Sequence, residues 1–344
     1  MRKALLAITF IGTIAALFIV SCTKTHYTCR TCGQTLATSP SLNQLFAGLR
    51  TTPQGLSVQA GRDTVVYGTD GTMLHFYTNS FRNGGGFTIT SGIVNLQLVE
   101  MYTPGAMIAN RATTMANGQI LQSSGQVTIS ATMNGLPVYA NRYGLGFRHS
   151  STTSAPMALF YGATNNADST AVWTQSDTTQ TGNTANGTTY DTLVASPSIF
   201  LFDSCTNFTW ANCDWFYYTD SPEYSVSVVL PDTSFNQNNT QMFLVLPNVN
   251  RWGNTADNYT AVLGATGFGS GSYTPATRTM QLISEGHTNI VPSGLNYELV
   301  VISNKNGQYY YWQTSGTVPY GGISISAAMA PVSEVDVISQ LQGL

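Results

Sequence analysis

The chain has 344 residues, of which 42% are hydrophobic and only 8% are charged, and its formal net charge is −3. This hydrophobic content suffices for packed cores and excludes wholesale disorder. The absence of a basic run excludes the electrostatic signature of a nucleic-acid-binding protein. Tyr, Thr and Val are abundant and no long helical pattern occurs, so the composition predicts a mainly β fold.

The first segment, residues 1–21, has the order of a signal peptide, with basic residues followed by an apolar run. A membrane-spanning helix needs about 20 apolar residues, and this run is shorter and interrupted by Thr and Gly. The run is followed by the sequence IVSC, which ends at Cys22 and resembles a bacterial lipobox. We therefore predict a lipoprotein signal peptide over 1–21 and a lipidated Cys22 that anchors the mature chain. The alternative is an ordinary secretory signal.

Residues 22–54 are predicted to form a lipidated tether that ends in a short helix, because its leucines are spaced by three and four. The cysteines other than Cys22 are even in number, which in an exported chain favours two disulfides. Pairing within each close couple is the simplest arrangement. A zinc site that uses the first couple is the alternative. The four residues are Cys29, Cys32, Cys205 and Cys213.

Two regions of alternating apolar and polar residues are predicted to be β-sandwich domains, at 55–150 and 223–332. In the first region, Asp70-Gly71 and Asn134-Gly135 are expected hairpin turns. In the second, Asn306-Gly307 is the strongest turn signal of the chain. Such short strands, separated by turns, are typical of a sandwich.

The segment between the two regions, 151–222, is predicted to be an irregular linker that contains an aromatic Trp-Asn-Cys-Asp sequence. Its middle has almost no apolar side chains to bury. The last segment, 333–344, is predicted to be a helix with Ser333 as its N-cap.

Three stretches, 94–107, 113–127 and 208–216, together resemble uncharacterised envelope lipoproteins of Bacteroidetes-type bacteria. The resemblance implies two immunoglobulin-like β-sandwich domains with short terminal helices. It also implies lipid anchorage in the cell envelope, at the outer membrane, with the periplasmic or surface face left open. It supplies no catalytic residues. Its pattern has one cysteine in the Trp-Asn-Cys-Asp segment, which corresponds to Cys213, so Cys205 departs from it.

Motifs for acyl transfer, zinc proteolysis, nucleotide binding and EF-hand calcium binding are absent, so we predict no catalytic, cofactor-binding or metal site. The densest aromatic cluster is the candidate ligand-binding site, since aromatic rings with Asn and Asp nearby are what carbohydrate stacking uses. The alternative is that its rings pack in the core between the two β domains. The candidate residues are Trp210, Asn212, Asp214 and Trp215.

These features together predict a membrane-anchored lipoprotein with a non-catalytic structural or binding role, whose partner is an envelope protein or a glycan and not a nucleic acid. The alternative is a glycan-active hydrolase, because glycoside hydrolysis needs only two suitably spaced carboxylates. Its candidate carboxylates are those beside aromatic or apolar neighbours, namely Glu100, Asp214, Glu223 and Glu285.

Overall fold

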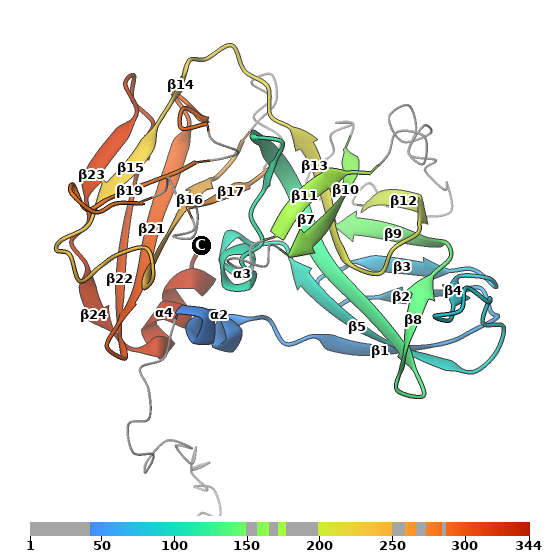
Figure 1. The fold of residues 1–344 in the computed structure, drawn as a ribbon. Helices are drawn as coiled ribbons and strands as arrows, with labels where there is room; N and C mark the ends of the chain where they lie inside the picture. The colour runs from blue at the N-terminus through green and yellow to red at the C-terminus, as the bar shows by residue number, and fades with distance from the viewer. Residues whose placement is uncertain are drawn as a thin grey trace, which may run out of the picture. The chain divides into compact units, whose positions relative to one another are not determined.

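The structure is a computed structural model that describes residues 42–148, 157–164, 171–176, 199–249, 259–265, 273–283 and 287–344. The chain divides into two units, Met1–Thr38 and Ser39–Leu344, and every described residue lies in the second. The described residues of this second unit are mainly β, which confirms the predicted fold class, and form two sandwiches and three short helices (Figure 1).

The first sandwich has a large and a small antiparallel sheet that enclose one core of buried residues from both. The large sheet has the strand order β1 (Gln54–Gln59), β5 (Ile93–Met101), β7 (Gln119–Met133), β13 (Trp210–Phe216), β10 (Ala158–Thr164), β11 (Ala171–Gln175), with β4 (Phe81–Arg82), β6 (Met115–Ala116) and β8 (Leu136–Ala140) at its margins. The small sheet has the order β12 (Ile199–Cys205), β9 (Tyr143–Arg148), β3 (Met73–Phe76), β2 (Thr64–Tyr67).

Alternation and turn chemistry explain these strands. In β5, Val94, Leu96 and Leu98 are fully buried while the residues between them are exposed, as a half-buried strand requires. The predicted hairpins form, but the connection between β2 and β3 spans residues 68–72, and its tight turn is centred on Thr69 and Asp70 instead of Asp70 and Gly71. Asn134 and Gly135 have φ values of 52° and 77° between β7 and β8, the left-handed pair that a two-residue hairpin turn favours.

The second sandwich also has two sheets around one core. One sheet has the order β18 (Tyr273–Thr274), β19 (Thr279–Gln281), β15 (Val226–Val229), β23 (Ile323–Ser326), in which β15 and β23 are parallel. The other has the order β17 (Ala261–Ala265), β16 (Thr240–Leu246), β21 (Asn296–Lys305), β22 (Gln308–Thr317), β24 (Ala330–Val332), and the short strands β14 (Glu223–Tyr224) and β20 (Val291–Pro292) pair separately.

Three helices fill the space between the sandwiches: α2 (Leu42–Leu49), α3 (Pro104–Asn110) and α4 (Glu334–Gln342) (Figure 1). They share a core with β5, β16, β17, β21 and β22, hereafter the shared core, in which Phe46 of α2 meets Phe243 of β16 edge to face at 5.9 Å. Both predicted terminal helices are confirmed, and Ser333 and Asp336 form the capping box of α4. No helix within the described ranges is long and apolar enough to cross a membrane.

The region 151–222 corrects the prediction of an irregular linker. It supplies β10 to β13, and the Trp-Asn-Cys-Asp sequence is an interior strand, β13, between β7 and β10. The first sandwich is therefore not complete within 55–150. The tether, 22–41, and the Thr-rich stretch, 178–189, lie outside the described residues.

Candidate functional site

Strand β13 carries all four candidate ligand-binding residues and places the two tryptophans on opposite faces of the large sheet, because successive side chains of a strand alternate. Trp215 packs against the core of the first sandwich and Trp210 against the shared core, and both also pack against a small cluster that contains Phe160 and Trp173. The Trp210 ring also meets the buried Trp173 ring edge to face at 6.3 Å. Both candidate rings are half-buried, and these contacts favour their interpretation as packing residues.

The polar candidates of β13 are fully buried on the side of the sheet that carries Trp210. Ser123 of β7 donates a hydrogen bond to the Asn212 side-chain oxygen at 3.0 Å, and the Asn212 amide donates to the Asp214 carboxyl. Burial raises the pKa of Asp214 well above its ordinary value, and the side chains of Ser123 and Asn212 only partly oppose this rise. The fold therefore favours the protonated form of Asp214, inside the sheet, more than water does.

The polar candidates lie next to the contact between the sandwiches. Ser123 of β7 and Thr260 form an isolated antiparallel bridge, and the Thr114 amide donates to the Val262 carbonyl at 2.7 Å. The indole N–H of Trp173 donates to the carbonyl of Thr113 in the same segment. The structure therefore places these candidate ligand-binding residues where the two β regions join. This position agrees with the alternative interpretation, in which the segment packs between the two β domains.

The disulfide predicted between Cys205 and Cys213 is wrong, since both residues are buried free thiols. They lie in strands of different sheets, β12 and β13, whose side chains enter the same core from two sides. Burial raises the pKa of the Cys205 thiol to about 12, and that of Cys213 well above its ordinary value, so neither is a thiolate at neutral pH. Cys22, Cys29 and Cys32 lie outside the described residues.

Glu100 of β5 is buried beneath the turn between β2 and β3. Its carboxylate accepts hydrogen bonds from the Asp70 and Thr72 amides, each at 2.8 Å, and from the Gln54 side chain at 2.6 Å. Burial raises the pKa of Glu100, but the hydrogen bonds from Thr72, Asp70 and Gln54 outweigh this effect and hold it below its ordinary value. Glu100 is therefore an ionised structural group that organises a turn.

The candidate carboxylates that the structure describes do not meet. Glu100 lies on β5 and Asp214 on β13 of the first sandwich, whereas Glu223 is exposed on β14 of the second region. Glu285 lies outside the described residues. No group of three or more His, Cys, Asp or Glu side chains within the described parts of the chain is arranged to hold a metal ion.

The structure also contains a polar cluster that the sequence analysis missed. On the outer face of the small sheet, the Tyr77 hydroxyl donates to Asp203, and Arg142 bonds the same carboxylate at 2.8 Å. The His75 ring lies tilted against the Tyr77 ring, with ring centroids 4.3 Å apart, and its Nε2 atom lies 2.8 Å from the Asp63 carboxylate. Tyr77 and Asp203 are 126 positions apart, so no local pattern could have joined them.

A cavity of about 340 Å³ lies among the three helices. Its lining is mainly apolar with a few hydroxyl and amide groups, and it includes Leu49, Thr51, Thr103, Ala106, Ile338 and Gln342. The Asn110 amide donates to Thr51 at 3.0 Å, and Thr103 caps α3. The Thr51, Thr103 and Asn110 side chains thus have hydrogen-bond partners in or beside the helices.

Comparison of the chain with models of protein families, with curated proteins and with solved structures found no match. The resemblance to Bacteroidetes-type envelope lipoproteins and the immunoglobulin-like character of the sandwiches therefore stay predictions.

Proposed function

We propose that the protein is a lipid-anchored lipoprotein of the bacterial envelope, attached to the outer membrane, that holds a partner protein or a glycan without turning it over. The anchor is Cys22, at the end of the lipobox-like sequence. The part that holds the partner is the compact unit Ser39–Leu344.

The observation that supports the non-catalytic role is that two of the candidate carboxyls are buried and bonded to other parts of the protein. Glu100 is enclosed by hydrogen bonds from a turn, and Asp214 is enclosed beside Asn212 with its pKa raised by burial. A pair of carboxylates for glycoside hydrolysis must flank a bond of the substrate from two sides. Both groups instead face protein atoms on separate strands, and this supports a structural role for each.

Fractionation of cells tests the anchor. Wild-type protein is expected in the membrane fraction, with an intact mass that includes acyl chains on a mature chain beginning at Cys22. Cys22→Ala should appear as unprocessed precursor or as protein released from the membrane, because the cysteine thiol is the site of acylation. A wild-type mass without any acyl addition would contradict the proposal.

Capture from native membranes tests the binding role. The anchored wild-type protein should retain a specific protein or polysaccharide, and it should leave envelope polysaccharides intact during incubation. The hydrolase alternative would replace the proposal if polysaccharide were cleaved and Glu223→Gln or Glu285→Gln abolished the cleavage while leaving the melting temperature unchanged.

A further inference from the structure

The cavity among the three helices has a polar mouth and an apolar floor. Thr51, Thr103 and Gln342 line the cavity and are exposed, so they mark its mouth. Ala109 and Leu341 line it and are buried, so they lie at its floor. None of the described lining residues is charged. The interior therefore suits an uncharged, apolar group, because a charge without a partner is costly to bury.

The walls of the cavity are held in place by contact between two helix backbones. Ala106 and Ala109 are three positions apart on α3, and so are Ile338 and Leu341 on α4. Each pair therefore shares one helix face. The two helices touch at Gly105, where a Cβ atom would overlap the Leu341 carbonyl oxygen. Because α3 and α4 cannot approach further, the space beside their contact is preformed, as small-molecule sites usually are.

The volume of the cavity limits the size of its ligand. A dry cavity of about 150 Å³ in another protein binds benzene. The cavity here has about 340 Å³. In proportion, it accommodates about ten to fourteen non-hydrogen atoms. This volume lies in the lower part of the range of about 300–1,000 Å³ for small-molecule sites, which are likewise mainly apolar with a few polar groups.

The hydroxyl groups at the mouth present protons to the cavity. The Thr51 hydroxyl oxygen accepts a hydrogen bond from the Asn110 side-chain amide at 3.0 Å. The Thr103 hydroxyl oxygen accepts one from the Ala106 backbone amide at 3.2 Å. Neither hydroxyl donates to a described residue. Since a threonine hydroxyl has one proton to donate, the mouth suits a hydrogen-bond acceptor on the ligand.

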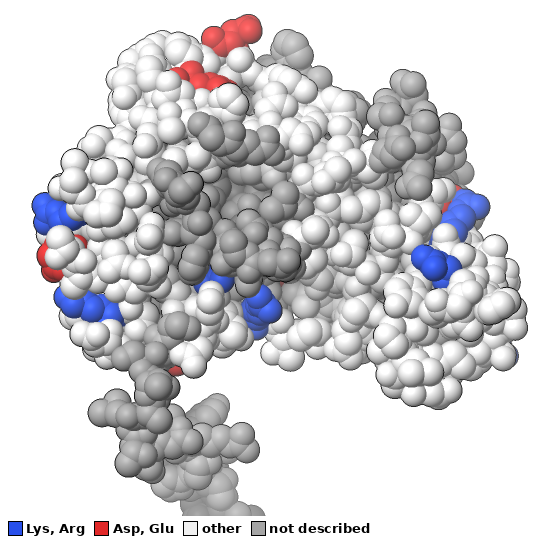
Figure 2. All heavy atoms as spheres, viewed as in Figure 1, with Lys and Arg blue, Asp and Glu red and all other residues white. Residues whose placement is uncertain are grey.

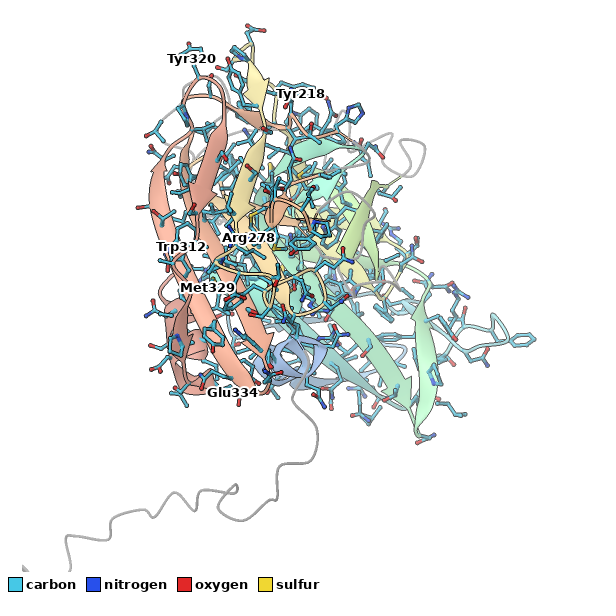
Figure 3. All side chains as sticks on the ribbon, turned by 60° about the vertical axis from the view of Figure 1, so that its left-hand side comes forward. Tyr218, Arg278, Trp312, Tyr320, Met329 and Glu334 are labelled. Carbon is cyan, nitrogen blue, oxygen red and sulfur yellow. The ribbon has the colours of Figure 1, made fainter. Side chains whose placement is uncertain are left out.

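The charges around the mouth disfavour a cationic ligand. Figure 2 shows basic side chains on the surface where α2 and α3 lie in the same view in Figure 1. Arg50 is exposed and lies in the chain between the lining residues Leu49 and Thr51. Both acidic residues of α4, Glu334 and Asp336, belong to its first turn, and Figure 3 shows Glu334 at the lower edge of the molecule. The cavity is instead lined by the later turns of α4.

We propose that this cavity is a binding site for a small, mainly apolar molecule that has a neutral hydrogen-bond acceptor, such as a ketone or ester carbonyl, at one end. The apolar part lies against Ala106, Ile338 and Leu341. The acceptor receives hydrogen bonds from the Thr51 and Thr103 hydroxyls at the mouth. The inference goes beyond the proposed function and depends neither on the lipid anchor nor on a protein or glycan partner.

The test follows the ¹⁹F NMR signals of 4-fluoroacetophenone, a ketone, and of 2-(4-fluorophenyl)ethylammonium, a cation, with full-length protein in lipid nanodiscs. The ketone should bind to the wild type, and the ammonium should not. Ala106→Leu fills the cavity and should weaken ketone binding about tenfold or more. Thr51→Val removes a donor and should weaken it about twofold to tenfold. Ala47→Leu changes an exposed residue of α2 outside the lining and should leave the affinity unchanged.

Identical nanodiscs for all variants cancel the partition of the ketone into lipid. Melting temperatures check that each variant is folded, and Ile338→Trp fills the same cavity from α4 if Ala106→Leu does not fold. Three results would overturn the inference: no ketone binding to the wild type beyond that of the filled variant, equal ketone binding by Thr51→Val, or binding of the ammonium as tight as that of the ketone.

Discussion

The surroundings of Glu100 and of Asp214 form an instructive comparison within one sheet. Both carboxyls lie on strands that pair with β7, and both are almost fully buried. Glu100 accepts hydrogen bonds from two backbone amides of a turn and from the Gln54 side chain, and its pKa is lowered. Asp214 has only the side chains of Ser123 and Asn212, and its pKa is raised. The donors around Glu100, the Thr72 side chain first among them, therefore outweigh its burial, whereas the two side chains beside Asp214 do not offset its complete burial.

Removal of the Trp210 ring, at the start of the strand that carries Asp214, should have the largest effect. Trp210→Ala takes a ring out of the contact with Trp173 and the shared core, and we expect a loss of about 3 kcal/mol in the free energy of unfolding. Chemical denaturation measures this loss, with Tyr320→Ala as the control for an exposed ring. Unchanged stability together with weakened glycan binding would show that Trp210 belongs to a ligand site.

Removal of the charge at Glu100 should have the next largest effect. Glu100→Gln weakens hydrogen bonds to an ionised acceptor, which contribute about 1.5–3 kcal/mol each, and the turn at residues 68–72 should loosen. Because the folded-state pKa of Glu100 is lowered, its contribution is present above the unfolded pKa of about 4.3. That contribution is lost as the pH falls through the folded-state pKa. Denaturation at several pH values should show this acid-linked loss in the wild type and a smaller one in the variant.

A substitution in the turn, Gly68→Ala, tests the packing of that turn against the Glu100 carboxylate. A Cβ at Gly68 would lie 2.5 Å from the Glu100 carboxyl atoms, so Gly68→Ala should cost about 1–3 kcal/mol by overpacking. In the Glu100→Ala background the clash is gone and the cost should largely vanish. This double-mutant cycle has a clear negative outcome. If Gly68→Ala destabilises the wild type and the Glu100→Ala variant equally, the strain does not arise from contact with the Glu100 carboxylate.

At low pH, Asp214→Asn should change the free energy of unfolding less than the other substitutions do. The sign of this change should reverse as the pH rises. Because the folded-state pKa of Asp214 is raised, wild-type stability is full below the unfolded pKa and falls as the pH rises through the folded-state pKa. Each unit of that rise costs about 1.4 kcal/mol once both states are ionised. Asn cannot ionise, so the variant should be more stable than the wild type at high pH. A parallel pH profile for the two proteins would contradict the raised pKa of Asp214.

Local patterns predicted the elements that local rules determine. Asn134-Gly135 and Asn306-Gly307 have the left-handed backbone that two-residue hairpins need, and Ser333 with Asp336 forms a capping box. The role of β13 could not be predicted in this way, because β7, β13 and β10 pair over long sequence separations. Polar Asn212 and Asp214 within an aromatic segment suggested a surface. Their partner Ser123 lies 89 positions from Asn212, so only the folded chain shows that they are buried.

The central claim is that the fold shifts the pKa values of the buried Glu100 and Asp214 carboxyls in opposite directions. Titration of their side-chain carboxyl ¹³C chemical shifts, assigned with the Glu100→Gln and Asp214→Asn variants, tests it most directly. The Glu100 carboxyl should lose its proton below its ordinary pKa, and the Asp214 carboxyl should keep its proton well above its own. Titration of both carboxyls at ordinary values, or in the reverse order, would contradict the account.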